Sequence, residues 1–586
     1  MGVAPRDQPM SRQAIVNRIA DGQAIVIFED CVLRLDSWLE KHPGGKLAIQ
    51  HMVGRDATDE MKISHSAPVV RGMKAYRIGR VAVGLPWHNL TPPIRGGVYT
   101  KVPESVNSDA QDTDVDLDIE TLSSSASSSD DLDSDVVDGD VTDQSSVTTD
   151  CNDSVDGDLK ATRPTTLRRR NVGNAAAVLS SPGSTNKINL TRNEYADLLI
   201  EKEADDSRNA YPSADPVTQS EIVAKYRALH QRVIDEGFYD CHYSAYLIEL
   251  SRYTTLFALS MTALYHEWYI TSAAFLGLFW HQIMFTAHDA GHCAITHHFE
   301  TDALIGLFIA DFCCGLSLGW WKSSHTIHHL ITNDTESDPD IQNVPLFANC
   351  PSFFKSLPST YYEGFVQTWD KVADILVPYQ KYTYYPVLAL ARFNLFFLSW
   401  LHVISSRSGA LRKGKAWWIR PTEVLFMSCY WFLYGYCLVW RTLPNWPIRV
   451  AFVLVSHVVT LPLHVQITLS HWGMPTSNIG ESESFPQRQL RTTMDVDCPA
   501  WLDWIHGGLQ FQAVHHLFPR VPRHNLRRLQ ALVREFSDDT GIKYSIHGFV
   551  DGNKVVLGRL EEVAKQVETL LKCSNHLAET GDMDLH

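Results

Sequence analysis

Three short clusters of histidine have a spacing that places several imidazole rings on one face of a helix. The clusters are His288 with His292, His325 with His328 and His329, and His515 with His516. Residues three or four positions apart share a helix face, so each cluster can direct its rings at one point. Gln512 stands three positions before His515, where a third ring would otherwise fit. Imidazole ligands suit redox iron or zinc, so the clusters predict a metal centre.

The number and type of these ligands favour two metal ions. Seven histidines are more than one ion binds, and no cysteine accompanies them, which argues against a zinc ribbon or an iron–sulfur cluster. Asp289 lies within the first cluster, where it either points away from the ligands or accepts a hydrogen bond from one of them, and we expect it to orient a ligand ring. Asp338 and Asp340 follow the second cluster, and they either support a ligand or act as helix caps or salt-bridge partners.

A separate pair of histidines lies near the N-terminus. His42 precedes the turn Pro43-Gly44-Gly45, and His65 follows 23 positions after it. Two imidazoles from opposed loops can occupy both axial positions of a haem iron, which then carries electrons and does not bind O2. The pair therefore predicts an electron-carrying haem site, with His51 between them expected at the surface.

Apolar segments must hold the three clusters at one face of a membrane. The runs long enough to cross about 30 Å of hydrocarbon are 247–264, 269–287, 421–440 and 448–470. The basic loop 405–420 marks the cytosolic side. All three clusters share that side if the runs at 303–321 and 385–404 lie in the interface or fold back. The sequence thus predicts four transmembrane helices, with both termini in the cytosol.

The net charge of −16 belongs to one segment of the chain. Between Lys101 and Lys160 there are 18 acidic residues and no basic ones, which leaves +2 for the rest. Residues 102–186 are rich in Ser, Asp, Thr and Gly and bury too little apolar surface to fold, so we predict a disordered acidic linker. A flexible chain over 85–186 has a root-mean-square reach of about 55 Å.

The N-terminal segment resembles the cytochrome b5 domain. The similarity rests on His42-Pro43-Gly44-Gly45, on the distance to His65, on Gly54-Arg55-Asp56-Ala57-Thr58 and on Tyr76-Arg77-Ile78-Gly79. It implies a small α+β domain that binds haem b, with His42 and His65 as the axial ligands.

The rest of the chain resembles membrane desaturases of the front-end group, in which a cytochrome b5 domain is fused and Gln begins the third histidine box. The matching segments include Gly507 to Gln512, His515 to Arg520, and Thr332-Asn333 followed by Asp338-Pro339-Asp340. The resemblance implies a multi-domain protein whose membrane part is all-α with a cytosolic histidine-rich cap. The expected parts are the cytochrome b5 domain 10–85, the linker 102–186, pre-membrane helices 187–246, the desaturase domain 247–545, and a C-terminal helix and tail 546–586.

This resemblance also implies two non-haem iron ions at the catalytic centre. The implied ligands are His288, His292, His325, His328, His329, His515 and His516. His471 matches a further ligand position, whereas Gln512 binds iron either directly or through water. We expect His281, His457 and His464 to be packed and hydrogen-bonded rather than ligating. His297 and His298 are expected to be exposed residues beyond the first cluster.

The overall length, the segment Gln466 to Trp472 and the long insert after the haem domain resemble fungal sphingolipid Δ8 desaturases. The resemblance implies an O2-dependent oxidoreductase of the endoplasmic reticulum membrane that places a double bond at C8 of the long-chain base of ceramide or glucosylceramide. An NADH-cytochrome b5 reductase would supply the electrons, and no nucleic-acid partner is expected. A front-end Δ5 or Δ6 fatty acyl desaturase and a b5-fused lipid hydroxylase are the alternatives. An electron-carrying adaptor would leave the converging histidines unexplained.

Overall fold

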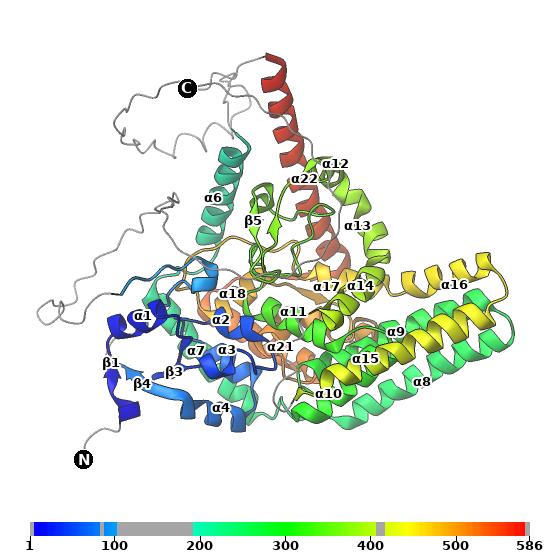
Figure 1. The fold of residues 1–586 in the computed structure, drawn as a ribbon, viewed down its shortest axis with the longest axis horizontal. Coiled ribbons are helices and arrows are strands. Elements are labelled where there is room, and N and C mark those ends of the chain that lie inside the picture. Colours follow the sequence, from blue (N-terminus) through cyan, green and yellow to red (C-terminus); the bar gives the residue numbers. More distant parts are fainter. Residues whose placement is uncertain (1–4, 83–86, 102–190, 406–415, 581–586) are drawn as a thin grey trace, which may run out of the picture. The chain divides into compact units, whose positions relative to one another are not determined.

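A computed structural model describes residues 5–82, 87–101, 191–405 and 416–580, and these ranges belong to one compact unit. The predicted linker, 102–186, lies outside the described residues, as does most of the basic loop 405–420. Figure 1 shows the described elements in chain order, from the N-terminal domain in blue to the long C-terminal helix in red.

The N-terminal domain is a small α+β fold built on a four-stranded sheet with the order β1-β4-β3-β2. Its strands are β1 (Pro9–Met10), β2 (Ile25–Phe28), β3 (Cys31–Arg34) and β4 (Arg77–Val81), of which only β1 and β4 pair in parallel. Its helices are α1 (Arg12–Ala20), α2 (Lys46–Gln50), α3 (Thr58–Ser64) and α4 (Ala67–Met73). All four side chains of β2 are buried, which anchors the sheet against the helices that carry the histidine loops.

Two polar helices precede the apolar part of the chain. α6 (Arg192–Ala210) begins with a capping box, in which the Thr191 side chain accepts from the Glu194 amide and the Glu194 carboxylate accepts from the Thr191 amide. α7 (Pro216–Asp235) begins at Asp215, whose carboxylate accepts from two amides of the first turn. Such caps satisfy amides that have no partner within the helix, and they fix where each helix starts.

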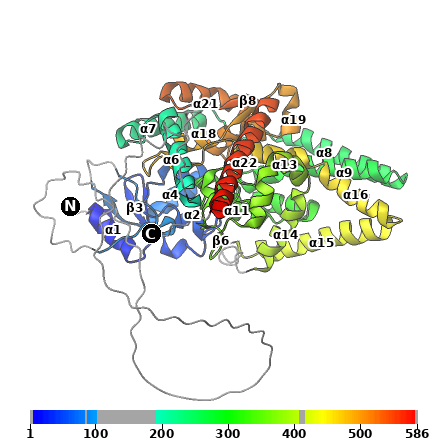
Figure 2. The same ribbon diagram turned by 90° about the horizontal axis from the view of Figure 1, so that it is seen from above.

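Three described helical segments are long and apolar enough to cross a membrane. They are α9 (Tyr269–Gly291), α15 with its π-helical continuation (Ile419–Thr442), and α16 with α17 (Trp446–Leu469). α8 (Tyr243–Tyr265) pairs with α9 in a hairpin, as Figures 1 and 2 show. It has the length of a span but is not among the three, because it carries Glu249, Arg252 and several hydroxyl side chains.

Two further helix pairs are bent and do not form straight spans. α10 (Phe299–Leu307) and its π-helical extension to Cys313 meet α11 (Leu318–Leu330) at 116°. The segment that contains α12 (Lys371–Leu376) and α13 (Gln380–Ala389) meets α14 (Ala391–Ile404) at 67°. The described residues thus hold three candidate spans, or up to five if each bent pair crosses, and the predicted four are not confirmed.

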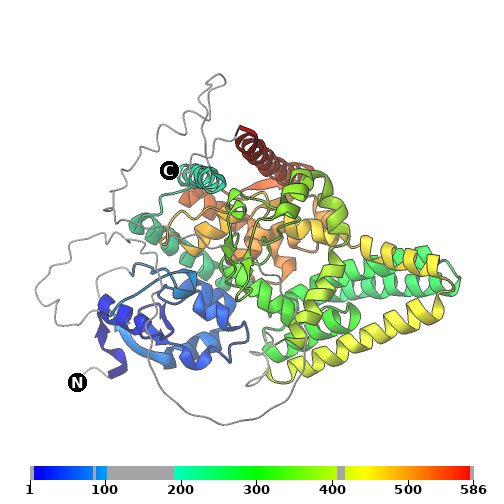
Figure 3. The same cartoon turned by 45° about the horizontal axis from the view of Figure 1, so that its top comes forward.

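The C-terminal part packs a polar, mostly helical layer beside these segments. Its helices are α18 (Phe485–Thr492), α19 (Asp503–His506), α20 (Gln512–Leu517), α21 (Leu526–Thr540) and α22 (Phe549–Thr580). Strands β7 (Asp495–Asp497) and β8 (Ile546–Gly548) pair in parallel, and β5 (Leu357–Pro358) pairs with β6 (Val366–Gln367). Figure 3 shows α22 in red over the green α12 and α13.

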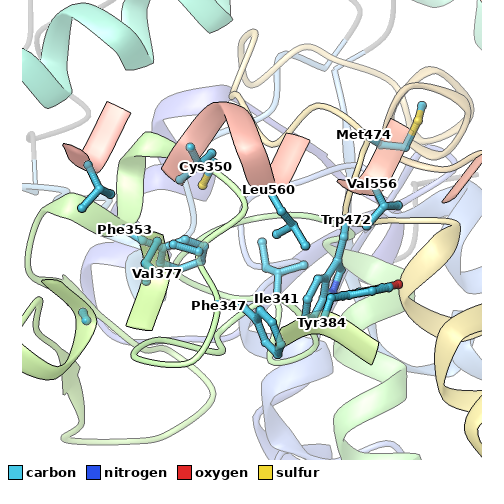
Figure 4. Close-up of a cluster of buried hydrophobic side chains, with 14 of the residues drawn as sticks. Ile341, Phe347, Cys350, Phe353, Val377, Tyr384, Trp472, Met474, Val556 and Leu560 are labelled. Carbon is cyan, nitrogen blue, oxygen red and sulfur yellow. The ribbon is translucent and has the colours of Figure 1, made fainter. Parts of the chain in front are cut away.

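A buried apolar cluster joins α22 to the segments below it. Figure 4 shows Val556 and Leu560 of α22 facing Tyr384 of α13 and Trp472, which follows α17. The rings of Tyr384 and Trp472 lie 5.9 Å apart, and the Tyr384 hydroxyl bonds to Thr468 at 2.7 Å. This packing fixes the end of α17, where His471 stands.

Candidate metal and haem centres

The two histidines of the N-terminal domain face each other across opposed loops. His42 precedes α2 and His65 follows α3, and their ring centroids lie 5.9 Å apart. The Nδ1 atom of His42 lies 3.1 Å from the Gly45 carbonyl, and that of His65 lies 2.9 Å from the Met61 carbonyl. A ring whose Nδ1–H donates to a carbonyl keeps Nε2 free as a metal ligand. The pair therefore fits the axial ligation of a haem.

The three histidine clusters converge on one buried centre, in which the histidines form two groups and His328 also forms a third group with Asp338 and Asp340. One group is His288, His292, His325 and His515, and the other is His328, His471 and His516. Within each group the ligand atoms lie within 4.8 Å of one another. Two such groups could hold two metal ions, and His471 lies in the second group; that these residues are ligands stays a prediction.

His329 lies between the two groups. Its Nε2 atom is 3.1 Å from the Nε2 of His325, and its ring stacks on His516 at a centroid distance of 4.0 Å. Two imidazole nitrogens that face each other this closely suit a shared cation. Gln512 is also buried, with 2% of its surface exposed, and its Oε1 has no hydrogen-bond partner.

Close helix packing brings these clusters together. The first stands at the end of α9, the second on α11, and the third on α20. A Cβ atom on Gly291 would lie 2.1 Å from the Trp321 ring, so only glycine allows α9 and α11 to approach this closely. Gly507 and Gly508 adopt φ values of 59° and 92°, which glycine tolerates, in the turn before α20.

Unpartnered buried nitrogens mark the centre as a cation site. The Nε2 atoms of His288, His292, His471, His515 and His516 are buried and have no hydrogen-bond partner. Buried polar atoms normally have partners, so a set of free nitrogens aimed at one place indicates bound ions. His325, His328 and His329 lie among these five, and all eight rings are candidate ligands.

Polar side chains hold several of these rings in place. Asp338 Oδ2 lies 2.8 Å from His328 Nδ1, while Asp340 is farther, at 3.7 Å. Gln489 Oε1 lies 2.9 Å from His516 Nδ1, and Gln489 Nε2 donates to the His329 carbonyl at 2.9 Å. The sequence pointed to Asp338 through its motif but carried no signal for Gln489, which lies 27 positions before His516.

Asp289 is paired mainly with an arginine rather than with a neighbouring ligand. Its Oδ2 accepts hydrogen bonds from Arg523 and Tyr246, whereas His288 Nδ1 is 3.8 Å from Oδ1. Arg523 also bonds to Glu249 and to the Phe285 carbonyl. Asp289 thus belongs mainly to a charged network that fixes the end of α9, and that it also orients the His288 ring stays a prediction.

A buried carboxylate holds the helix of the third cluster. Asp495 Oδ1 accepts from the Ala513 amide at 2.7 Å, and its Oδ2 accepts from Gln530 at 2.8 Å and from the Tyr544 hydroxyl. Burial raises the pKa of Asp495 to about 6. The hydrogen bond to Ala513 ties the first turn of α20 in place next to Gln512.

Five further histidines lie outside the two metal groups, and one of them, His297, is less exposed than expected. His281, His457 and His464 are buried but belong to neither metal group. Both ring nitrogens of His297 lie within 2.9 Å of backbone carbonyls, so that ring is partly buried and engaged, and not simply exposed. His298 is exposed.

His51 was expected at the surface, and that prediction is wrong. It is 1% exposed, because the segment that carries Thr360 covers it, and its Nε2 lies 3.2 Å from the Thr360 hydroxyl. Burial lowers the pKa of His51 to about 4, so the ring is neutral at physiological pH.

The domains and centres described above match two known families. Residues 11–82 match the cytochrome b5-like haem/steroid binding domain, and residues 267–548 match the fatty acid desaturase family. The chain is therefore a cytochrome b5-fused member of the desaturases, a class of membrane oxidoreductases.

Relatives that match nearly the whole chain show which desaturases it is most similar to among those compared. The chain is 45% identical to the Delta 8-(E)-sphingolipid desaturase of Emericella nidulans over 99% of both chains. It is 42% identical to the protein of the same name from Candida albicans over 97% of both chains. A Delta(8)-fatty-acid desaturase of Helianthus annuus is 38% identical over 52% of this chain and 64% of its own. The chain belongs to the family of these b5-fused desaturases.

Proposed function

We propose that this protein desaturates the long-chain base of ceramide or glucosylceramide at C8, using O2 and electrons that enter through its own haem domain. The observation that carries the proposal is the near full-length similarity to Delta 8-(E)-sphingolipid desaturases, together with two converging histidine groups. It acts at the endoplasmic reticulum membrane as a multi-pass protein, with both termini and the histidine boxes in the cytosol.

The histidine groups fit a pair of non-haem iron ions. His288, His292, His325 and His515 would hold one ion, and His328, His471 and His516 the other, with His329 between them. The donor set is nitrogen without cysteine, which suits redox iron. When bound, such iron supplies the O2 chemistry needed to break unactivated C–H bonds, which no side chain can do alone.

The residues around the centre control the position and charge of these ligands. Asp338 accepts the Nδ1 proton of His328 and keeps its Nε2 directed at the second group. Gln489 serves His516 in the same way, and Gln512 offers a neutral amide oxygen to the cluster, directly or through water. Burial excludes bulk water from the histidine rings of α11 and α20.

Electrons would reach this centre from the haem held by His42 and His65. Each double bond requires two electrons from outside, and a six-coordinate haem carries one at a time. An NADH-cytochrome b5 reductase would recharge it. A covalent tether makes delivery intramolecular, at an effective concentration of order mM for a short flexible link, which falls as the link lengthens.

Lipid analysis of a strain that expresses the protein separates this proposal from its rivals. A double bond in the sphingoid base supports the proposal. A new double bond in a fatty acyl chain would identify a front-end Δ5 or Δ6 desaturase, and a hydroxylated product without a double bond would identify a lipid hydroxylase. The control strain expresses the His515→Ala variant, which we expect to make no product.

A further inference from the structure

A cavity of about 330 Å³ is lined by charged, polar and apolar side chains, among them Arg523, which bonds to Asp289 of the first histidine cluster, and it has no part in the steps above. Its walls come from the start of α8, from the segment 500–511 and from the turn that leads into α21, elements that Figure 2 shows at one side of the helical region. Small-molecule sites typically measure roughly 300–1,000 Å³, so the cavity suits the polar end of a lipid rather than its chains.

Three residues that line the cavity carry a buried polar atom without a hydrogen-bond partner. They are Gln510, through Oε1, Arg523, through Nε, and His524, through Nε2. Gln510 is 1% exposed, and its Nε2 already donates to Asp503 at 3.0 Å. The free atoms comprise an acceptor, a donor and a ring nitrogen that can do either. These atoms are buried in the cavity wall, so a ligand group that both donates and accepts hydrogen bonds would pair with them once the side chains turn toward the cavity.

The charges around the cavity favour a neutral ligand. Arg523 is neutralised by Glu249 and Asp289, and Arg527 by Asp503, whose Oδ2 lies 2.8 Å from its Nε. The remaining cation, Arg252, donates to the Gln282 amide oxygen at 2.9 Å, and its guanidinium lies 5.4 Å from the centre of the Trp504 ring. Bidentate capture of a phosphate needs an open guanidinium edge, and carboxylates occupy such an edge of both Arg523 and Arg527.

The cavity is coupled to the metal centre through one helix turn. Arg523 donates to the carbonyl of Phe285 at 3.0 Å and bonds to Asp289, which is adjacent to the ligand His288. Gly507 packs so closely that a Cβ atom there would lie 2.2 Å from the Phe285 ring. Arg523 thus links the cavity wall to the residue beside His288, and a group bound in the cavity would lie next to the network that fixes the end of α9.

An exposed tryptophan in the cavity wall, with a second three positions before it in the sequence, favours a place at the membrane surface. Trp504, which lines the cavity, is 44% exposed, and Trp501 is 71% exposed. Tryptophan is enriched where membrane meets water, because one end of the ring is apolar and the other donates a hydrogen bond. A lipid head group lies at this depth, with its chains extending into the apolar layer.

We infer that this cavity binds the neutral, hydroxyl- and amide-bearing head of the sphingolipid substrate, and that Gln510 and His524 are positioning residues that set which carbon reaches the histidine centre. The inference rests on the proposed function and names the part of the substrate that this site recognises. Holding the head fixes the register of the chain, because correct placement of the reacting carbon is what converts binding into rate.

The test uses the holoprotein in lipid nanodiscs with a short-chain ceramide as the probe. Gln510→Met removes both polar atoms at nearly constant volume, and His524→Phe keeps the ring against Tyr246, whose centroid is 4.6 Å away. Gln231→Met, at an exposed position on α7, is the matched control. We expect each cavity variant to raise KM about three- to tenfold, to lower kcat and to place part of the double bonds away from C8. Haem and iron content should be unchanged, and the control should keep wild-type values.

Binding without a reductant supplies a second readout that needs no turnover. The wild-type protein should bind short-chain ceramide more tightly than its 1-O-methyl analogue, and the Gln510→Met and His524→Phe variants should lose that discrimination. If both variants keep the wild-type KM and still bind ceramide more tightly than its 1-O-methyl analogue, the inference about the cavity is wrong, while the proposed function stands. If a sphingoid base 1-phosphate binds more tightly than ceramide, the inference that the cavity prefers a neutral head group is wrong. Desaturation of acyl chains only, by the wild-type protein, would overturn the proposed function and with it the inference.

Discussion

The imidazole of His328 and the carboxylate of Asp338 form a pair sealed from solvent, with Nδ1 2.8 Å from Oδ2 and side-chain exposures of 1% and 0%. The carboxylate fixes the ring so that Nε2 faces His471 and His516. A ligand held in one orientation binds a metal without first losing rotational freedom. This pair therefore explains how α11 presents one of its three histidines to the second group rather than the first.

Replacing Asp338 with Asn should weaken the second metal group. The amide cannot accept the Nδ1 proton with the strength of a carboxylate, and loss of such a partner typically lowers metal affinity or activity about 10- to 100-fold. We expect fewer than two non-haem irons per haem by metal analysis, with the haem spectrum intact. Asp340→Asn, 3.7 Å from the same nitrogen, should have a smaller effect. Full iron content in Asp338→Asn would show that the pair is not needed for binding.

Two histidines of α9 should behave in opposite ways. His292→Ala removes a nitrogen of the first group, so we expect loss of bound iron and no detectable product. His281→Ala lies on the same helix, is also buried, and contacts Phe285 rather than the metal groups, so its iron content should match the wild type. Iron analysis of both purified variants checks the assignment, and equal iron loss in the two would contradict it.

Removing a haem ligand should abolish electron delivery without emptying the iron centre. His42→Ala should eliminate the haem absorbance and the product while non-haem iron remains, because the two sites share no ligand. The exposed His88 provides the control, since His88→Ala should keep both. Addition of a separate cytochrome b5 should not restore turnover. Efficient rescue would show that delivery does not depend on the fused domain.

Asp495 should make stability depend on pH in a definite direction. Its pKa of about 6 in the folded protein lies above its ordinary value of 3.8, so folding favours the protonated form. The stabilising contribution of Asp495 is fully present below pH 4. It decreases by at most about 3 kcal/mol as the pH rises from 4 to 6, and it does not change further at higher pH. In Asp495→Asn that dependence should vanish. Thermal unfolding of the wild type and of Asp495→Asn from pH 4 to 8 measures this pH dependence. If the unfolding temperatures of the two proteins change with pH in parallel, Asp495 does not cause it.

Local periodicity was sufficient to predict much of the candidate site. The spacing within each histidine cluster is short, so helical geometry alone determines that His325, His328 and His329 share a face. The same applies to the turn at Pro43, which displays His42 beside α2. In these cases the neighbours that decide the arrangement lie within a few positions in the sequence.

Contacts between residues far apart in the sequence could not be predicted from local spacing. His51 is buried by Thr360, 309 positions away, and Asp289 is neutralised by Arg523, 234 positions away. Gln489 has no motif of its own and acquires its role only when α18 packs against α20. Hydropathy also did not predict the number of spans, because it does not report that the helix pairs on either side of Cys313 and of Ala389 are bent by 116° and 67°.

The position of the double bond in the product tests the central claim most directly. The purified protein would be supplied with O2, NADH, cytochrome b5 reductase and a ceramide with a saturated long-chain base. Mass spectrometry of the released base, after cleavage at the double bond, should place it between C8 and C9. A double bond at any other position of the base, or in the acyl chain instead, would contradict the account.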